Sequence, residues 1–171
     1  NKKYKLKKDM CVISDKSGVL GLGGIIGGIT TSTELDTKNI LLEAAYFSPS
    51  SVRKTARVLN INTDAKYRFE RGIDPNSIKE GLDLATELIL KICGGEASKL
   101  QIIGKTHQKN KVINFQVEKF EKLIGISITA NEIDKILTSL GFKCKKSQKA
   151  IKVEVPSWRP DVSLDEDLIE E

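Results

Sequence analysis

The stretch TANEIDKILTSLG, residues 129–141, carries the clearest helix signals in the sequence. Thr129 followed three residues later by Glu132 forms a capping box, in which each side chain satisfies a backbone N–H of the first helical turn. Gly141 is suited to end the helix. The apolar residues recur at helical spacing: Ile133, Ile136, Leu137 and Leu140. We predict an amphipathic helix here.

The segments around this helix predict a compact module over residues 106–171. KVINFQV (111–117) is typical of a strand and EKFEKLIG (118–125) of a short helix stopped by Gly125. After the helix, FKCKK (142–146) and IKVEV (151–155) predict two strands, because apolar and charged residues alternate in the second. Two helices and a few strands in so short a segment indicate a winged-helix-like module.

The residues before this module predict a second mixed unit over residues 1–105. CVIS (11–14) and VLGLGG (19–24) flank a glycine-ended turn and predict a hairpin. Ser48 followed by Pro49 begins a short amphipathic helix, and a longer one is expected from Asp74 and Pro75 to the glycines after Cys93. We place the boundary between the units in GKTHQKN, residues 104–110, and predict an α+β fold class.

The stretch NILLEAAYF, residues 39–47, predicts a buried strand with one carboxylate, Glu43, in its middle. An ionised carboxylate in an apolar environment costs several kcal/mol unless it is paired or hydrogen-bonded. Its partner is either structural, for example Arg68 or Arg71, or a ligand. The residues alone leave both alternatives open.

Composition excludes several classes of protein. The chain of 171 residues is 39% hydrophobic and 30% charged, which indicates globular rather than disordered domains. It has no apolar run near the ~20 residues that span a bilayer and no signal peptide, so we expect a cytoplasmic protein without membrane contact. Three scattered cysteines and one histidine, His107, predict neither a disulfide framework nor a metal site.

Positive charge is concentrated in the first unit. Residues 1–105 hold 17 Lys and Arg against 12 Asp and Glu, with five lysines in the opening NKKYKLKK. Residues 106–171 hold 11 against 11, which lacks the basic excess typical of a phosphate-binding surface. Trp158 and Arg159 could stack on a base, but a Trp between two prolines is more often a core residue. For the second module we therefore favour a structural role over nucleic-acid binding.

The glycine-rich segment at residues 21–28 does not predict a nucleotide site. Gly21, Gly23 and Gly27 fit a loose glycine pattern after a strand, but no helix follows that could face a pyrophosphate. Gly27 and Gly28 instead indicate a place where another backbone or a ligand approaches closely, or a tight turn alone.

Several motifs, taken together, resemble one family. GGIIGG (23–28), LDTKNILLEAAYFSP (35–49), LNINTDAKYRFERGIDP (59–75) and ICGGEAS (92–98) are similar, in order and spacing, to the editing module of bacterial phenylalanyl-tRNA synthetase beta subunits. LGF (140–142) and VPSWRPDVSLDEDLIEE (155–171) resemble the helix-rich module that follows it in that family. The resemblance covers nearly the whole chain.

The resemblance implies a function. Members of this family form an α2β2 ligase with an alpha subunit, and the enzyme attaches phenylalanine to its tRNA using ATP and magnesium. The editing module of the beta subunit hydrolyses tRNA mischarged with tyrosine, and Glu43 matches the residue that recognises the tyrosine hydroxyl. Other positions that match the pocket lining are Gly27, Thr63 and Ala65, with Gly23 and Gly24 in its glycine-rich wall.

Some positions depart from the family pattern. Position 23 is Gly where Ala is usual, and Lys66 stands where a small residue is common, so pocket size and local charge differ. The family's editing histidine is expected before residue 1, and His107 does not match it, so we assign no catalytic residue.

Ser163 and Glu166 predict a capping box for a helix that continues beyond Glu171. We expect a piece of a longer chain; the alternative is an assembly or tRNA-binding piece with an inactive editing pocket.

Overall fold

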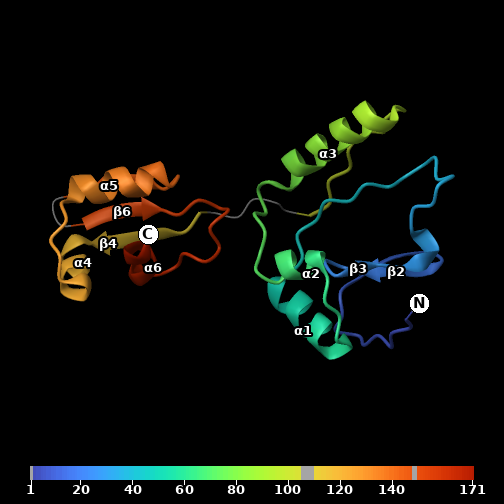
Figure 1. The fold of residues 1–171 in the computed structure, drawn as a ribbon, viewed down its shortest axis with the longest axis horizontal. Coiled ribbons are helices and arrows are strands. Elements are labelled where there is room, and N and C mark those ends of the chain that lie inside the picture. Colours follow the sequence, from blue (N-terminus) through green and yellow to red (C-terminus); the bar gives the residue numbers. More distant parts are fainter. Residues whose placement is uncertain (1, 105–109, 148–149) are drawn as a thin grey trace. The chain divides into compact units, whose positions relative to one another are not determined.

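The computed structural model describes residues 2–104, 110–147 and 150–171, and it shows two compact units (Figure 1). One unit comprises Asn1–Ile73 and Ser77–Gly104, and the other comprises Asp74–Asn76 and Lys105–Glu171. Within the described residues there are two antiparallel three-stranded sheets and six α-helices, so the predicted mixture of helices and strands is confirmed. The predicted boundary at 104–110 lies largely outside the described residues, and the limits 1–105 and 106–171 stay a prediction.

The first unit contains a small sheet, a 3-10 turn and three helices. Their bounds, in chain order, are β1 Val12–Asp15, β2 Gly18–Leu22, β3 Ile26–Gly27, η1 Ile29–Thr31, α1 Pro49–Leu59, α2 Asp64–Phe69 and α3 Ile78–Cys93. The strand order is β1-β2-β3, with both pairs antiparallel. The predicted hairpin and the helix that begins at Pro49 are confirmed.

A few apolar side chains hold the first unit together. Its buried core consists of Leu22, Ile25, Val52, Ala56 and Ile61. These come from β2, the glycine-rich loop after it, α1 and the residue that follows the C-cap of α1. The core therefore fixes the loop against one face of α1.

The prediction of a buried strand at residues 39–47 was wrong. These residues form neither helix nor strand, and the Leu41 side chain is 90% exposed. Figure 1 shows the segment as an extended path between η1 and α1. The physical reason is that an extended segment becomes a strand only when a neighbour accepts and donates its backbone hydrogen bonds, and no described strand pairs with it. An apolar run reveals the preference for burial but not the neighbour.

Two helices differ from the sequence prediction. The helix expected from Asp74 begins at Ile78 with Ser77 at the N-cap position, although its end at Cys93 before Gly94 is confirmed. Helix α2 was not predicted at all. It is only six residues long, which is too short for an apolar stripe to show.

The described part of the second unit contains three strands and three helices, and one strand lies in the centre of its sheet. The elements are β4 Val112–Gln116, α4 Val117–Ile124, α5 Ala130–Ser139, β5 Lys143–Lys146, β6 Ala150–Glu154 and α6 Asp165–Glu170. The sheet order β4-β6-β5 places β6 between two antiparallel neighbours. All predicted elements of residues 111–155 are confirmed, including the Thr129–Glu132 capping box of α5.

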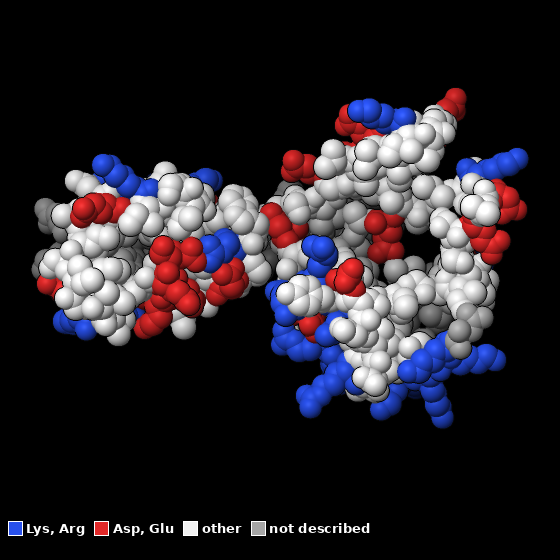
Figure 2. Space-filling view, viewed as in Figure 1, with Lys and Arg blue, Asp and Glu red and all other residues white. Residues whose placement is uncertain are grey.

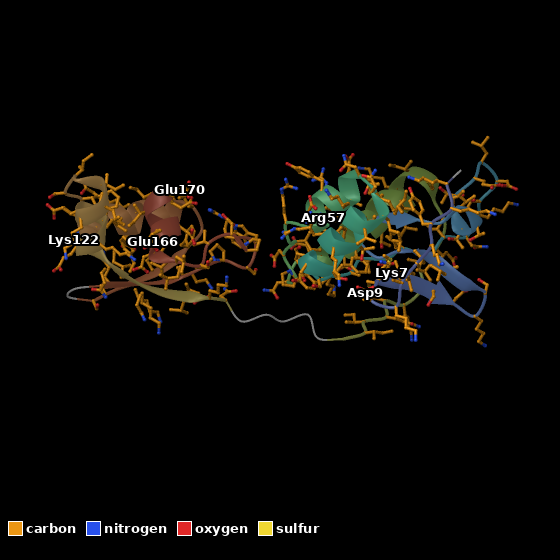
Figure 3. All side chains as sticks on the ribbon, turned by 90° about the horizontal axis from the view of Figure 1, so that it is seen from below. Lys7, Asp9, Arg57, Lys122, Glu166 and Glu170 are labelled. Carbon is orange, nitrogen blue, oxygen red and sulfur yellow. The ribbon has the colours of Figure 1, made fainter. Side chains whose placement is uncertain are left out.

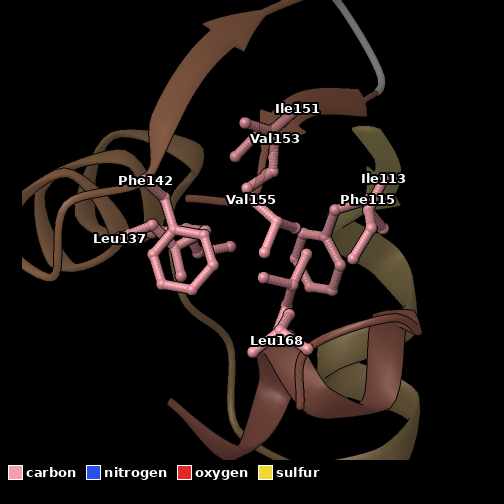
Figure 4. Packing of buried hydrophobic residues seen from close by; sticks show 10 residues of the cluster. Ile113, Phe115, Leu137, Phe142, Ile151, Val153, Val155 and Leu168 are labelled. Carbon is pink, nitrogen blue, oxygen red and sulfur yellow. The ribbon is translucent and has the colours of Figure 1, made fainter. Parts of the chain in front are cut away.

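One face of this second sheet carries the larger of the two cores. Figure 4 shows side chains from β4 and β6 meeting those of α5 and α6. Ile151 and Val153 of β6 are completely buried, and Phe115, Leu137 and Phe142 are nearly so. Because apolar residues alternate along β4 and β6, the sheet buries only this face.

Details near the end of the second unit correct two predictions. The carboxylate that caps α6 is Asp167, which accepts hydrogen bonds from the N–H groups of Ser163 and Leu164 at 2.7 and 2.8 Å. Glu166, the predicted capping residue, instead lies 2.8 Å from Lys119 Nζ. Trp158 is 57% exposed rather than a core residue, although its ring lies against Gly141.

No described helix has both the length and the apolar character needed to cross a membrane.

Leu137→Ala should destabilise the second unit strongly. The side chain is 2% exposed in the larger core, so truncation leaves a cavity and costs about 3 to 5 kcal/mol of unfolding free energy. Urea unfolding followed by the fluorescence of Trp158, the single tryptophan of the chain, measures this unit selectively. The matched control is Leu140→Ala, where the side chain is 41% exposed and a loss under about 1 kcal/mol is expected. Equal losses in both variants would contradict the burial.

Candidate functional site

Gly23 and Gly24 form a contact surface for an aromatic ring. A methyl group at Gly23 would lie 2.7 Å from Phe47 Cε1 and 3.0 Å from Cys11 Sγ. At Gly24 it would lie 3.0 Å from Phe47 Cδ2 and 3.1 Å from Val52 Cγ2. Gly24 also has φ +68°, which disfavours any side chain there. The predicted wall glycines are thus needed for close packing.

The Phe47 ring was not singled out as a functional residue from the sequence. It makes an edge-to-face contact with Phe69 of α2, with ring centroids 5.3 Å apart. A usable signal was present, because Phe47 directly precedes the N-cap Ser48 and Val52 is the fourth helical residue. This is the spacing of a hydrophobic staple, which fixes how the chain enters a helix. Phe47 therefore holds the end of the segment that carries Glu43 against the glycine pair.

Gly27 and Gly28 differ in what surrounds them. A methyl group at Gly28 would lie 2.5 Å from the Leu20 carbonyl oxygen, and the Gly28 N–H donates to that oxygen at 2.7 Å. Close backbone approach is therefore confirmed at Gly28. At Gly27 no described atom would lie within 4 Å of an added methyl group, so the space beside it is open.

Thr63 joins α2 to the glycine-rich loop. Its hydroxyl donates to the Ile25 carbonyl oxygen at 2.7 Å and accepts from the Lys66 N–H at 3.1 Å. The second bond is the N-cap of α2 and the first fixes that helix beside Ile25. Ala65, two residues on, is exposed on α2. The structure thus brings Thr63 to the loop of Gly23 and Gly24.

Glu43 lies on the extended segment before Phe47 and has no internal partner in the described parts of the chain. Its carboxylate forms no hydrogen bond and no ion pair there, and the side chain is exposed by surface area. Neighbouring protein atoms nevertheless remove part of its hydration, and this burial raises the pKa of the Glu43 carboxyl above its ordinary value. The carboxylate is therefore partly desolvated and unpaired.

The arginines considered as partners for Glu43 have other contacts. Arg71 donates to the Tyr67 carbonyl oxygen, lies 3.2 Å from Glu70 Oε1, and places its guanidinium 3.6 Å from the Tyr67 ring centroid. Glu70 also pairs with Lys66 at 3.1 Å, with both side chains largely buried. Arg68 makes no ion pair among the described residues. The contacts of Lys66, Glu70 and Arg71 stabilise α2 and the turn after it.

One side of the first unit is rich in basic side chains (Figure 2). Figure 2 shows Lys and Arg gathered on the side of the first unit that holds the N-terminal segment and α1. One of them, Lys54, pairs with Asp9 at 2.8 Å. Within the described residues no group of three His, Cys, Asp or Glu is placed to hold a metal ion, and His107 lies outside them.

Two domain models match the chain. Residues 1–94 match the B3/4 domain and residues 113–171 match the tRNA synthetase B5 domain. Together they define the chain as part of an aminoacyl-tRNA synthetase.

Full-length relatives identify the particular family. A protein of Mesorhizobium japonicum named phenylalanine–tRNA ligase beta subunit is 41% identical over 99% of this chain and 21% of its own length. Proteins of the same name from Bradyrhizobium diazoefficiens (42% identity, 98% of this chain, 21% of the relative) and a Wolbachia of Brugia malayi (41%, 99% and 22%) are similar. The chain belongs to the family of phenylalanine–tRNA ligase beta subunits and spans about a fifth of the length of these relatives.

Thr63→Val should loosen α2 from the loop. The change removes both hydroxyl bonds at nearly constant volume, and we expect a loss of about 1 to 2 kcal/mol of unfolding free energy. Hydrogen exchange at the Lys66 amide, which donates to Thr63, should become faster. Thr63→Ser keeps the hydroxyl and is the control. Unchanged exchange in the valine variant would show that the cap is not formed in solution.

Glu43→Gln should stabilise the 171-residue chain at pH 7. A carboxyl whose pKa is raised on folding favours the folded state less as pH rises from its unfolded pKa through its folded pKa, so the cost belongs to the ionised form of Glu43. The variant should be more stable than the parent at pH 7 and equal to it under acid conditions where Glu43 is protonated. Urea unfolding across pH measures this, with Glu34→Gln on the same exposed stretch as control. A loss of about 3 to 5 kcal/mol would instead reveal a hidden ion pair.

Proposed function

We propose that the first unit forms part of an editing site that hydrolyses tRNA mischarged with tyrosine, within a phenylalanine–tRNA ligase. The observation that carries this proposal is the Glu43 carboxylate, which is partly desolvated and has no hydrogen bond or ion pair in the described residues. A group of that kind gains free energy when a ligand supplies a hydroxyl donor. Family membership supports tyrosyl-tRNA as that ligand.

The chemistry of selection explains why a carboxylate serves here. A synthesis pocket that fits phenylalanine rejects tyrosine only through its extra hydroxyl, and a second site that requires the hydroxyl corrects the errors. Tyrosine would donate to Glu43, whereas phenylalanine would leave the carboxylate desolvated and unpaired. Sites built to bind a substrate hydroxyl discriminate by roughly 10⁴ to 10⁵.

The other proposed pocket residues divide into two roles. Gly23, Gly24 and Thr63 are committed to internal contacts, with Phe47 and with the Ile25 carbonyl oxygen, so they would shape the pocket wall. Gly27 and Ala65 face open space or solvent, so they would leave room for the aminoacyl group. We assign no catalytic nucleophile or base to this chain.

The remaining parts of the proposal concern the whole enzyme. It would act in the cytoplasm as an α2β2 assembly with an alpha subunit, and it would charge the tRNA for phenylalanine using ATP and magnesium. No described cluster of carboxylates or histidines fits a metal ion, so we derive no step through magnesium in this chain. The limits 1–105 and 106–171 for the editing module and for a winged-helix-like second module belong to the same proposal.

Glu43→Ala in the complete enzyme should relax the selection for tyrosine. Loss of a hydrogen bond to a charged group is worth roughly 1.5 to 3 kcal/mol, so deacylation of tyrosyl-tRNA should fall by about one to two powers of ten. Hydrolysis of phenylalanyl-tRNA, normally excluded, should rise, because the unpaired carboxylate is gone. Deacylation rates with both charged tRNAs measure the change.

Two controls separate recognition from folding in this experiment. The rate of phenylalanine attachment should hardly move, and Glu34→Ala on the same stretch should leave both deacylation rates unchanged. If Glu43→Ala leaves the ratio of tyrosyl- to phenylalanyl-tRNA hydrolysis unaltered, Glu43 does not recognise the hydroxyl. The unit would then be better described as a non-catalytic assembly or tRNA-binding piece.

A further inference from the structure

The segment that carries Glu43 is held from one end only. Residues 39–47 pair with no described strand, and their backbone forms no hydrogen bond within the described parts of the chain. Such a segment keeps its place only through its side chains. All side chains of residues 39–43 are exposed, whereas Ala44, Ala45 and Phe47 are half-buried. The position of Glu43 therefore depends on the residues that follow it.

Phe47 is the main anchor among these residues. Ala44 and Ala45 each offer a single methyl group, which buries little apolar area. The Phe47 ring packs against the core of the first unit and makes an edge-to-face contact with Phe69 at 5.3 Å. Aromatic pairs in this geometry gain free energy beyond their buried area and prefer one orientation. The ring therefore fixes the downstream end of the segment in both position and direction.

The surfaces that receive the Phe47 ring belong to the other parts of the candidate site. Gly23 and Gly24, the two wall glycines, lie so close to the ring that a methyl group on either would be within 3.0 Å of it. Phe69 is on α2, which begins at the N-cap Thr63. Thr63 in turn is hydrogen-bonded to the glycine-rich loop. The ring thus joins the segment of Glu43 to the wall and to α2 in a single contact.

We propose that Phe47 is a positioning residue for hydroxyl recognition, because its ring fixes the Glu43 carboxylate relative to the glycine wall. The proposal rests on the role proposed above for Glu43. Four residues of extended chain span up to about 13 Å, so Phe47 acts through the chain rather than by touching the tyrosine side chain. A displacement of about 1 Å at a reacting or recognised group can cost roughly 100-fold in rate. A carboxylate that can turn towards water would also exclude phenylalanine less well.

The test is Phe47→Leu in the complete phenylalanine–tRNA ligase. Leucine stays apolar but loses the ring contacts with Phe69 and the glycine pair. The ratio of kcat/KM for deacylation of tyrosyl-tRNA to that of phenylalanyl-tRNA should fall about tenfold, mainly through kcat for tyrosyl-tRNA. The rate of phenylalanine attachment should hardly move. Phe47→Tyr keeps the ring and should hold the ratio within about twofold of the parent enzyme.

A double-mutant cycle shows whether the ring acts through Glu43. In the Glu43→Ala background there is no carboxylate to position, so adding Phe47→Leu should change the ratio less than about twofold. An equal effect of Phe47→Leu in both backgrounds would overturn the proposal. If Glu43→Ala alters the ratio and Phe47→Leu does not, only the positioning role fails. If Glu43→Ala itself leaves the ratio unaltered, the proposed recognition of the hydroxyl fails and this inference fails with it.

A truncation at the other end of α1 controls for lost stability. Phe47 precedes this helix and Ile61 follows it, beyond the last turn, which Arg57 marks in Figure 3. Ile61 is 7% exposed in the same core, so Ile61→Val weakens the packing without touching the segment of Glu43. This variant should leave the ratio unchanged, and thermal melting compares its stability with that of Phe47→Leu. A similar fall of the ratio in Ile61→Val would overturn the proposal. If Phe47→Leu does not fold, Phe47→Met removes the ring at similar volume and takes its place.

Discussion

The alternation of side chains along β6 is the constraint on which the second unit depends. Ile151 and Val153 are completely buried in the core that also holds Leu137 of α5. Each pairs in register with one residue of β4 and one of β5. Period-two geometry then forces Lys152 and Glu154 to the other face, whatever their chemistry. One set of residues thus determines both the position of the core and the charge pattern on the opposite face of the sheet. A shift of register by one residue would bury Lys152, so the register is strongly specified.

In the first unit the equivalent anchor is the contact between Phe47 and the glycine pair. Because Gly23 and Gly24 lack side chains, the ring can approach their backbone and also meet Phe69 of α2. Thr63 reinforces this arrangement through the Ile25 carbonyl oxygen. The residues that shape the proposed site are therefore the same ones that hold a small core together. Substitutions at these glycines would disturb folding and recognition at once, which makes Glu43 the cleaner probe of function.

The sequence predicted well wherever the signal was local. The capping box at Thr129, the glycines that end α4 and α3, and the alternation in β6 depend on residues within a few positions of each other. Residues 39–47 failed for the opposite reason, since a strand requires a neighbour that composition does not reveal. The partner of Glu43 likewise depends on contacts in three dimensions. In the described residues neither Arg68 nor Arg71 forms an ion pair with it. Helix α2 was too short to show a pattern.

Charge shows most directly why counting residues is insufficient. Lys and Arg equal Asp and Glu in number in residues 106–171, and a count alone argues against a phosphate-binding surface. The fold distributes the two signs unevenly: the exposed strand positions carry Lys143, Lys145 and Lys152 with one acid, whereas eight of the 11 acids lie on α4, α5 and α6. Interactions between exposed charges decay over about 8 to 10 Å in physiological salt, so a charged ligand responds mainly to the side chains beside it. The local field, rather than the net charge, determines what such a small unit can bind.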